Sequence, residues 1–189
     1  FTAPESEIRR RVDDAARGLR RGQRFVRGVY SGGTLAWEAL HLLERALGDA
    51  GDGVTGSGAG HRIVDFGADV FTVGRPHPMI DGGVRRDAIR REAADPATAV
   101  ILLDLVLGYG AHPDPAGELL PALDGARAEA RAAGRGLVVV ASVVGTDGDP
   151  QGLTAQTARL EASGVIVMPS NAQAARLAAR VAARVAGGD

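Results

Sequence analysis

Four residues near the amino terminus, Ser31-Gly32-Gly33-Thr34, have the composition of an anion-binding turn. They join an apolar segment at residues 25–30 to a segment with helical periodicity at residues 35–47. Glycines let the backbone approach a ligand closely, and free N–H groups at a helix start favour a phosphate or a carboxylate. The same residues also suit a tight turn in which Ser31 or Thr34 caps the helix, so both interpretations stay open.

A second candidate is the loop Gly74-Arg75-Pro76-His77-Pro78. Its two prolines fix φ and disfavour a helix, so the loop is expected to be stiff. A stiff loop holds a guanidinium or an imidazole at low entropic cost, and both groups bind anions. The alternative is a surface loop in which Arg75 pairs with a neighbouring Asp.

Asp104 is expected to end an apolar strand at residues 99–103, and His112 and Asp114 follow in the next loop. A carboxylate at the end of a strand suits a general base or a metal ligand, whereas all three residues also suit helix capping. Their spacing matches no metal-binding signature, so no metal site is predicted. Residues 146–149 and 170–171 are interpreted as capping sequences.

The elements that would position these residues alternate between strands and helices. Apolar segments lie at residues 25–30, 61–66, 70–73, 99–103 and 137–142, with a short last strand at 165–167; helical patterns lie at 35–47, 84–93, 116–133, 153–163 and 171–185. This alternation predicts a doubly wound α/β fold with a mostly parallel sheet of five strands in the flavodoxin-like order 2-1-3-4-5. In such sheets ligands bind at the carboxyl ends of the strands, where the candidate loops fall.

Domain organisation is predicted from the two ends of the chain. Residues 4–21 indicate a charged helix capped by Ser6, so residues 1–24 are expected to form an arm or interdomain connector and residues 25–189 the domain. Residues 48–60 are Gly-rich and lack periodicity, which indicates a loop. Because the first residue is Phe1, we expect a piece of a longer protein.

Composition excludes several classes of function. All 22 basic residues are Arg and there is no Cys, so lysine nucleophiles, disulfides and thiolate metal sites are excluded. The formal net charge of −1 gives no indication of nucleic-acid or membrane binding. No apolar run approaches the roughly 20 residues of a membrane span, and no signal peptide is recognised, so a cytoplasmic protein is expected.

Several motifs together resemble the FdrA family. They are Val29-Tyr30-Ser31-Gly32-Gly33-Thr34-Leu35 followed by Trp37-Glu38-Ala39, Phe71-Thr72-Val73-Gly74-Arg75-Pro76-His77-Pro78-Met79-Ile80-Asp81, Asp95-Pro96, Ile101-Leu102-Leu103-Asp104, Leu107-Gly108-Tyr109-Gly110-Ala111-His112, Asp149-Pro150-Gln151 and Ser170-Asn171-Ala172. The resemblance covers about residues 25–177. It implies a flavodoxin-like ligase domain similar to the α subunit of succinyl-CoA synthetase and to NDP-forming acyl-CoA synthetases, in which Gly33 and Thr34 would contact the phosphoryl group.

Two departures from the synthetases bear on the chemistry. Where the synthetases have a glutamate that orients the catalytic histidine, this chain has Asp104-Leu105-Val106-Leu107-Gly108. Where they have the phosphohistidine loop, it has Gly145-Thr146-Asp147-Gly148-Asp149, and no His follows His112. A phosphoryl carrier needs a nucleophilic nitrogen at that place, so the usual phosphohistidine relay is not expected here.

The resemblance implies a subunit of a carbamoyltransferase that handles oxamate and carbamoyl phosphate. Ser31, Gly32, Gly33 and Thr34 would bind the anion, Arg75 would pair with it, His77 or His112 would stabilise an oxyanion or move a proton, and Asp104 completes the set. No cofactor is expected in this domain, and CoA or a nucleotide would be bound by other domains of the longer protein. Expected partners are a small anionic substrate and other domains or subunits, with a homo-oligomer left open. The alternatives are an acyl-CoA ligase domain and a non-catalytic assembly or ligand-binding domain.

Overall fold

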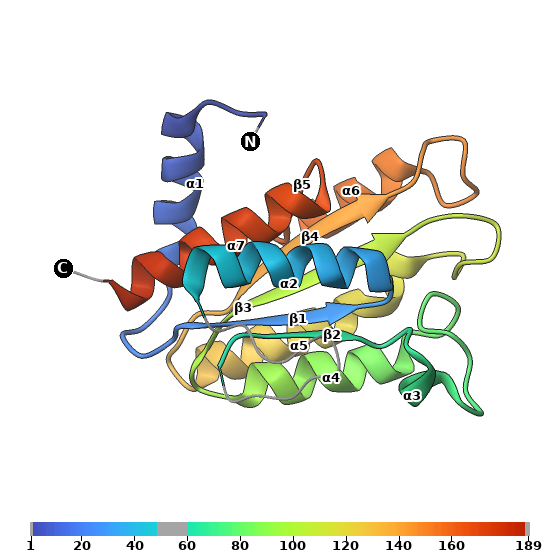
Figure 1. Ribbon diagram of the computed structural model, residues 1–189, viewed down its shortest axis with the longest axis horizontal. Helices are drawn as coiled ribbons and strands as arrows, with labels where there is room; N and C mark the ends of the chain where they lie inside the picture. Colours follow the sequence, from blue (N-terminus) through green and yellow to red (C-terminus); the bar gives the residue numbers. More distant parts are fainter. Residues whose placement is uncertain (1, 49–59, 188–189) are drawn as a thin grey trace.

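The computed structural model describes residues 2–48 and 60–187, which form a three-layer α/β sandwich (Figure 1). The sheet contains β1 (Phe25–Tyr30), β2 (Arg62–Asp65), β3 (Thr98–Val106), β4 (Val138–Val144) and β5 (Ile166–Met168). These five strands are parallel and adopt the order β2-β1-β3-β4-β5. The predicted doubly wound, flavodoxin-like order is therefore confirmed.

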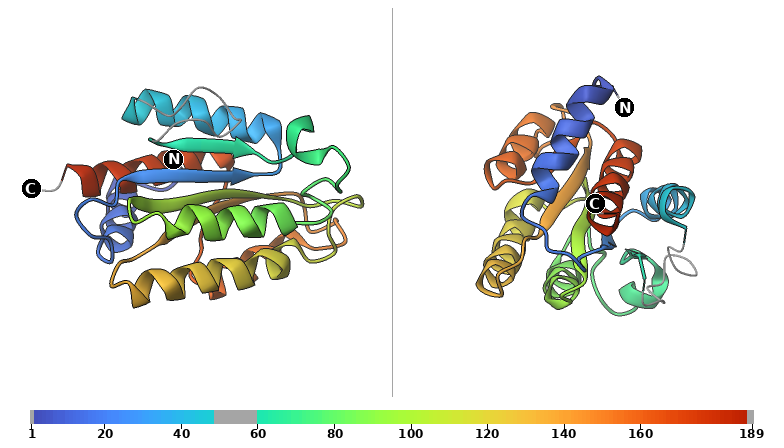
Figure 2. Two further views of the ribbon diagram at one scale, coloured as in Figure 1. Left: turned by 90° about the horizontal axis from the view of Figure 1, so that it is seen from below. Right: turned by 90° about the vertical axis from the view of Figure 1, so that its left-hand side faces the viewer.

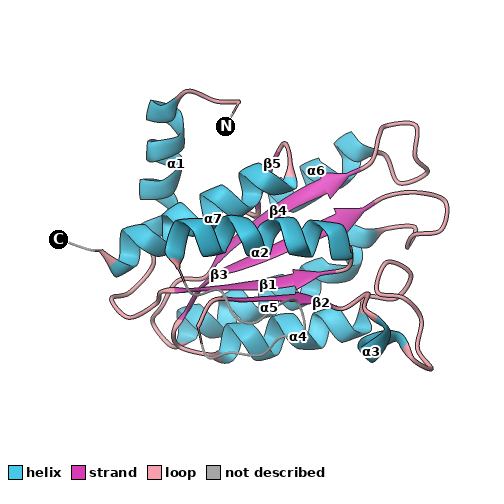
Figure 3. Cartoon of the chain, in the orientation of Figure 1, coloured by secondary structure: helices cyan, strands magenta, loops and turns pink. Residues whose placement is uncertain are grey.

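Helices cover both faces of the sheet (Figures 2 and 3). They are α1 (Glu5–Ala16), α2 (Gly33–Leu47), α3 (Asp69–Thr72), α4 (Gly83–Ala94), α5 (Pro115–Ala132), α6 (Leu153–Ala162) and α7 (Asn171–Ala186). One hydrophobic cluster joins the sheet to α1, α2 and α7, and a second joins it to α4, α5 and α6. Because both faces are covered, the central strand β3 is apolar at almost every position.

Three local predictions were wrong. Residues 70–73 form the short helix α3 and its end, because Val70 and Val73 are exposed to solvent and do not enter the core. Asp104 does not end its strand, since β3 continues to Val106. Pro4, not Ser6, precedes the first helical residue of α1. The loop predicted at residues 48–60 lies almost entirely outside the described residues.

The segment predicted to be an arm packs against the domain. Ile8 and Val12 of α1 are buried in the cluster formed with α7. After α1 the chain crosses the amino-terminal edge of the sheet, where Gln23 Nε2 donates to Thr98 O at 2.7 Å and to Gly136 O at 2.8 Å. None of the helices that the structure describes is long and apolar enough to cross a membrane.

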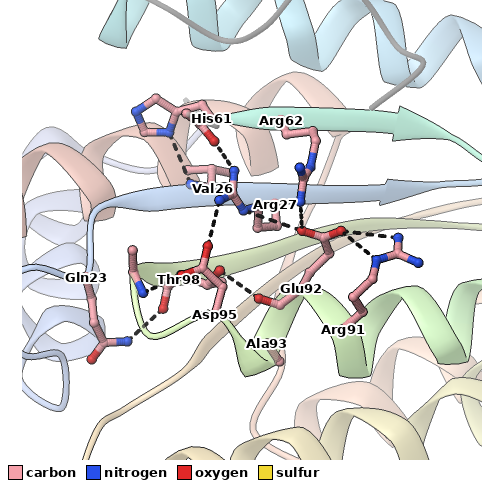
Figure 4. Close-up of polar contacts among 12 residues, drawn as sticks. Gln23, Val26, Arg27, His61, Arg62, Arg91, Glu92, Ala93, Asp95 and Thr98 are labelled. Carbon is pink, nitrogen blue, oxygen red and sulfur yellow. Dashed lines mark hydrogen bonds and ion pairs between the residues drawn. The ribbon is translucent and has the colours of Figure 1, made fainter. Parts of the chain in front are cut away.

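A buried network of charges ties β1 and β2 to α4 near the amino-terminal half of the sheet (Figure 4). Arg27 Nη2 donates to Asp95 Oδ2 at 2.8 Å, and Arg27 Nε lies 3.5 Å from Glu92 Oε2. Glu92 also pairs with Arg62 of β2. Burial alone would raise the pKa of Asp95, but hydrogen bonds from the Ala97 amide and Arg27 outweigh it and lower that pKa. This network holds β1, β2 and α4 together at the end of the sheet opposite the candidate site.

Candidate functional site

Asp104 holds the glycine-rich turn that follows β1. Its carboxylate accepts hydrogen bonds from Ser31 N at 2.9 Å, Ser31 Oγ at 3.1 Å and Gly32 N at 2.9 Å. Arg85 of α4 donates from Nη2 to Asp104 Oδ1 at 3.0 Å and to Asp104 O at 2.6 Å. The amides of Ser31 and Gly32 are therefore bound to Asp104, and these hydrogen bonds fix the position of the turn.

The Arg85–Asp104 ion pair is buried, and its electrostatics follow from that burial. Arg85 is 3% exposed and Asp104 is fully buried. Burial lowers the pKa of Arg85, although Asp104 and Glu118 favour the charged form. Burial also raises the pKa of Tyr30, and the nearby Asp104 carboxylate adds to that rise, so Tyr30 stays a neutral hydrogen-bond donor. A charge pair in this environment needs both partners, because either charge alone would lack solvation.

The amino terminus of α2 lies next to this pair, since Gly32 N donates to Asp104 Oδ2 at 2.9 Å. Gly32 precedes the helix in an extended conformation and supplies no side-chain cap. The amides of Ser31 and Gly32 donate to Asp104, whereas those of Gly33, Thr34 and Leu35 donate to no residue that the structure describes. Thr34 is exposed. Three backbone donors and the positive end of the helix dipole therefore face the carboxyl edge of the sheet.

α7 begins beside α2 at the same edge (Figure 1). A polar cluster of Tyr30, Asn171 and Glu38 joins the two helix starts. Tyr30 donates from its hydroxyl to Asn171 Oδ1 at 2.9 Å. Asn171 Nδ2 donates to Leu35 O and to Glu38 Oε2, each at 2.8 Å. These bonds fix the relative positions of the first turns of α2 and α7.

A buried carboxylate that sequence reasoning missed, Asp65, stands between the turn and the predicted histidine. A Cβ atom added to Gly33 would lie 2.8 Å from Asp65 Oδ2. A Cβ added to Gly67 would lie 2.6 Å from His77 Nε2 and 3.1 Å from Asp65 Oδ1. Gly67 therefore leaves the space through which His77 approaches Asp65 and the Ser31 carbonyl.

The proline-containing loop and the loop after β3 meet at this edge. His77 Nδ1 accepts from Met79 N at 3.2 Å, and His112 N donates to Met79 O at 2.7 Å. His112 Nδ1 accepts from Asp114 N at 3.0 Å. Arg75 lies in the same loop as His77 with an exposed side chain. The structure thus places all the predicted site residues at the carboxyl edge, with His77 nearest the turn and Arg75 at the periphery.

Residues 145–149, where the synthetases that the sequence resembles have their phosphohistidine loop, cap the helix α6 in this chain. Asp147 accepts from Thr154 N at 2.7 Å and from Thr154 Oγ1 at 2.8 Å. The hydrogen bond from the Thr154 amide lowers the pKa of Asp147. Ser170 likewise caps α7 by accepting from Gln173 N at 3.3 Å. The described residues contain no group of three or more side chains that could hold a metal ion.

Sequence reasoning missed Arg85 and Asp65, for different reasons. Arg85 lies in a charged helical segment, where an arginine normally faces water, so no local signal indicated its burial. Asp65 carried a signal, because it ends β2 and parallel strands direct their carboxyl ends to the ligand edge.

Comparison with known proteins agrees with this architecture. Residues 29–181 match the CoA-ligase family. The uncharacterized protein YahF of Escherichia coli strain K12 is 37% identical over 177 residues, which cover 88% of this chain and 34% of YahF. The chain therefore spans about a third of the length of this relative.

Two solved structures share the fold at low sequence identity. The dinucleotide-forming acetyl-coenzyme A synthetase 1 of Candidatus Korarchaeum cryptofilum, solved with phosphate and ADP, has a TM-score of 0.60 and 13% identity over 98% of this chain and 39% of its own. PH0766 of Pyrococcus horikoshii OT3 has a TM-score of 0.52 and 14% identity over 98% of this chain and 41% of its own. With the family match covering most of its length, the chain belongs to the CoA-ligase family.

Proposed function

We propose that this chain is the anion-binding domain of a larger enzyme of the CoA-ligase family, and that the first turn of α2 binds the phosphoryl group of an acyl phosphate. The observation that carries the proposal is that Asp104 accepts hydrogen bonds from some amides of the turn and leaves the others available to a ligand. Asp104 binds those of Ser31 and Gly32, whereas those of Gly33 and Thr34 donate to no residue that the structure describes. A helix start with unpaired amides favours phosphate.

His77 supplies a side chain for the same ligand. Its Nδ1 accepts a hydrogen bond from the Met79 amide, so the neutral imidazole carries its proton on Nε2. This Nε2 faces the space beside Gly67, next to the turn. A donor at that place can stabilise an oxyanion of the bound acyl phosphate or shield the phosphoryl group from Asp65. Arg75, at the rim, is proposed to attract the anion.

The missing histidine favours a bound acyl phosphate over a phosphorylated protein. Residues 145–149 form a capping loop, and no histidine follows His112. Carbamoyl phosphate is an acyl phosphate. We therefore propose, more specifically, that the larger enzyme is an FdrA-type carbamoyltransferase whose other ligand is oxamate. An acyl-CoA ligase that uses a histidine from another domain is the second candidate, supported by the family match.

The proposal is tested by calorimetric titration of the 189-residue chain with acetyl phosphate, carbamoyl phosphate and inorganic phosphate. Gly33→Pro removes one donor at a position where proline suits a helix start, and Gly32 already has the extended conformation that a following proline requires. Gly33→Ala is the matched control, because both variants place a Cβ beside Asp65. Losing one hydrogen bond to a charged group weakens binding about 10- to 100-fold.

Weaker binding in Gly33→Pro than in Gly33→Ala supports the proposal, and equal binding in the two variants contradicts it. The covalent alternative is tested separately with ATP labelled at the γ-phosphate. Acid-labile phosphohistidine on this chain would show that a histidine such as His77 or His112 carries the phosphoryl group, against the proposal. His77→Asn is expected to weaken binding, and Arg75→Ala to weaken it mainly at low ionic strength.

A further inference from the structure

A cavity of about 630 Å³ opens at the amino-terminal edge of the sheet, opposite the candidate site. Its floor is apolar and includes Leu137, Val138 and Ile166 at the starts of β4 and β5, with Leu19 on the α1 side. The right-hand view of Figure 2 looks onto this edge, and α1 crosses in front of β4. The size falls within the range of about 300–1,000 Å³ that is typical of small-molecule sites.

The frame of this cavity is fixed by backbone contacts. Gly18, just after α1, packs against Gly136, where a Cβ would collide with the Gly18 carbonyl. Gln23 bridges the same region by donating to Thr98 O and Gly136 O. The segment that covers the cavity is therefore held to the sheet, and the cavity exists before any ligand arrives.

Three arginines line the cavity, and among the described residues one of them, Arg127, lies within ion-pair distance of a carboxylate, with its Nη1 3.9 Å from Asp124 Oδ1. Arg127 of α5 donates to Ser163 O at 2.6 Å and to Gly164 O at 2.8 Å, both neutral carbonyls. Arg131, one turn further along α5, forms no ion pair with any residue that the structure describes. Arg135 donates one nitrogen to a carbonyl, and its buried Nη1 has no hydrogen-bond partner in the described chain.

The electrostatics of this lining favour an anion. Burial lowers the pKa of Arg127, and repulsion from Arg131 lowers it further, against a favourable effect of Asp124. Among the lining residues that the structure describes, Asp14 carries the carboxylate, and it already pairs with Arg17. Three guanidinium groups against this one carboxylate give the lining a net charge of +2.

We infer that this cavity binds a small organic phosphate monoester, with its phosphate on Arg127, Arg131 and Arg135 and its apolar body on the floor. A phosphate monoester carries a charge of about −1.5 to −2 at pH 7, which matches the lining. Its oxygens can accept paired hydrogen bonds from more than one guanidinium. The apolar floor adds affinity that inorganic phosphate cannot use. This site is separate from the one at α2 and does not depend on it.

The test is calorimetric titration of the chain with phenyl phosphate, inorganic phosphate and phenol at low ionic strength. Phenyl phosphate is expected to bind saturably, inorganic phosphate at least about tenfold more weakly, and phenol without measurable affinity. Absence of saturable phenyl phosphate binding, or equal affinity for inorganic phosphate, overturns the inference.

Two charge reversals locate the binding. Arg131→Glu is expected to weaken phenyl phosphate binding at least about tenfold. Arg45→Glu on α2, which is also exposed and forms no ion pair with a described residue, is the control and is expected to change it less than about twofold. Equal effects of the two variants, or unchanged binding in Arg131→Glu, overturn the assignment. Gly33→Pro is expected to leave phenyl phosphate binding intact, because the cavity is separate from the site at α2. A loss in Gly33→Pro comparable to that in Arg131→Glu also overturns the assignment.

Discussion

Asp104→Asn is expected to destabilise the protein strongly, because it removes the charge that balances buried Arg85. In the wild-type protein the Asp104 carboxylate accepts from Ser31 N, Ser31 Oγ, Gly32 N and Arg85 Nη2. An asparagine retains one acceptor oxygen but directs an NH₂ group towards donors. The guanidinium then stays buried without a counter-charge.

The magnitude follows from the burial of both partners. Removing one member of a buried ion pair costs about 3–5 kcal/mol, compared with a total stability of about 5–15 kcal/mol for a typical domain. For a chain of this size, 1 kcal/mol lowers Tm by about 2–4 °C, so the expected shift is about 6–20 °C. The same variant removes one of the two carboxylate oxygens that position the amides of Ser31 and Gly32, so the turn loses its fixed geometry and anion binding is also expected to weaken.

The assay is urea unfolding followed by far-ultraviolet circular dichroism. Asp13→Asn is the matched control, because it breaks the exposed ion pair with Arg184 at 3.0 Å and is expected to cost less than about 1 kcal/mol. The double variant Arg85→Met with Asp104→Asn removes both charges and is expected to lose less stability than the two single changes added together. A loss below about 1 kcal/mol in Asp104→Asn, or strict additivity, would refute the reasoning.

Two further predictions concern α1 and the cap of α5. Ile8→Ala is expected to lower the free energy of unfolding by about 2–5 kcal/mol, because Ile8 is fully buried against α7; a loss below about 1 kcal/mol would show that α1 does not pack there. Burial would raise the pKa of Asp114, but the Gly117 amide, Gln156 and Arg159 outweigh it and lower that pKa. Asp114→Ala is therefore expected to cost about 1 kcal/mol at pH 7. Because the folded pKa is depressed, the wild-type advantage is fully present above about pH 4 and disappears as acid protonates the carboxyl; an advantage that persists at lower pH would contradict this sign.

The strand order, and the edge of the sheet at which the candidate residues lie, could be predicted from the sequence by general rules of α/β folds. Right-handed crossovers restrict the orders that alternating strands and helices can adopt, and a count of about five strands indicated the flavodoxin-like order among them. The same rule brings the residues after β1, β2 and β3 to one edge, where the structure indeed places His77 beside the turn that contains Ser31.

Burial of individual polar residues was not predictable in the same way. Arg85 sits in a helix rich in charges, and only the packing of α4 against β1 and β3 shows that its side chain turns inwards to Asp104 and Val29 O. The apolar residues Val70 and Val73 have strand-like side chains, yet nothing in the sequence indicates that they face solvent. Tertiary packing decides both cases, because the neighbours that bury Arg85 or leave Val70 and Val73 exposed are distant in the sequence and local preference is weak.

The most direct test of the central claim is a phosphate titration of the ¹⁵N-labelled chain followed by ¹H–¹⁵N correlation spectra. The account predicts that the amide resonances of Gly33, Thr34 and Leu35 shift most and saturate together, while those of Ser31 and Gly32, already bonded to Asp104, move little. Saturable shifts centred on residues 145–152, with the first turn of α2 unchanged, would contradict it.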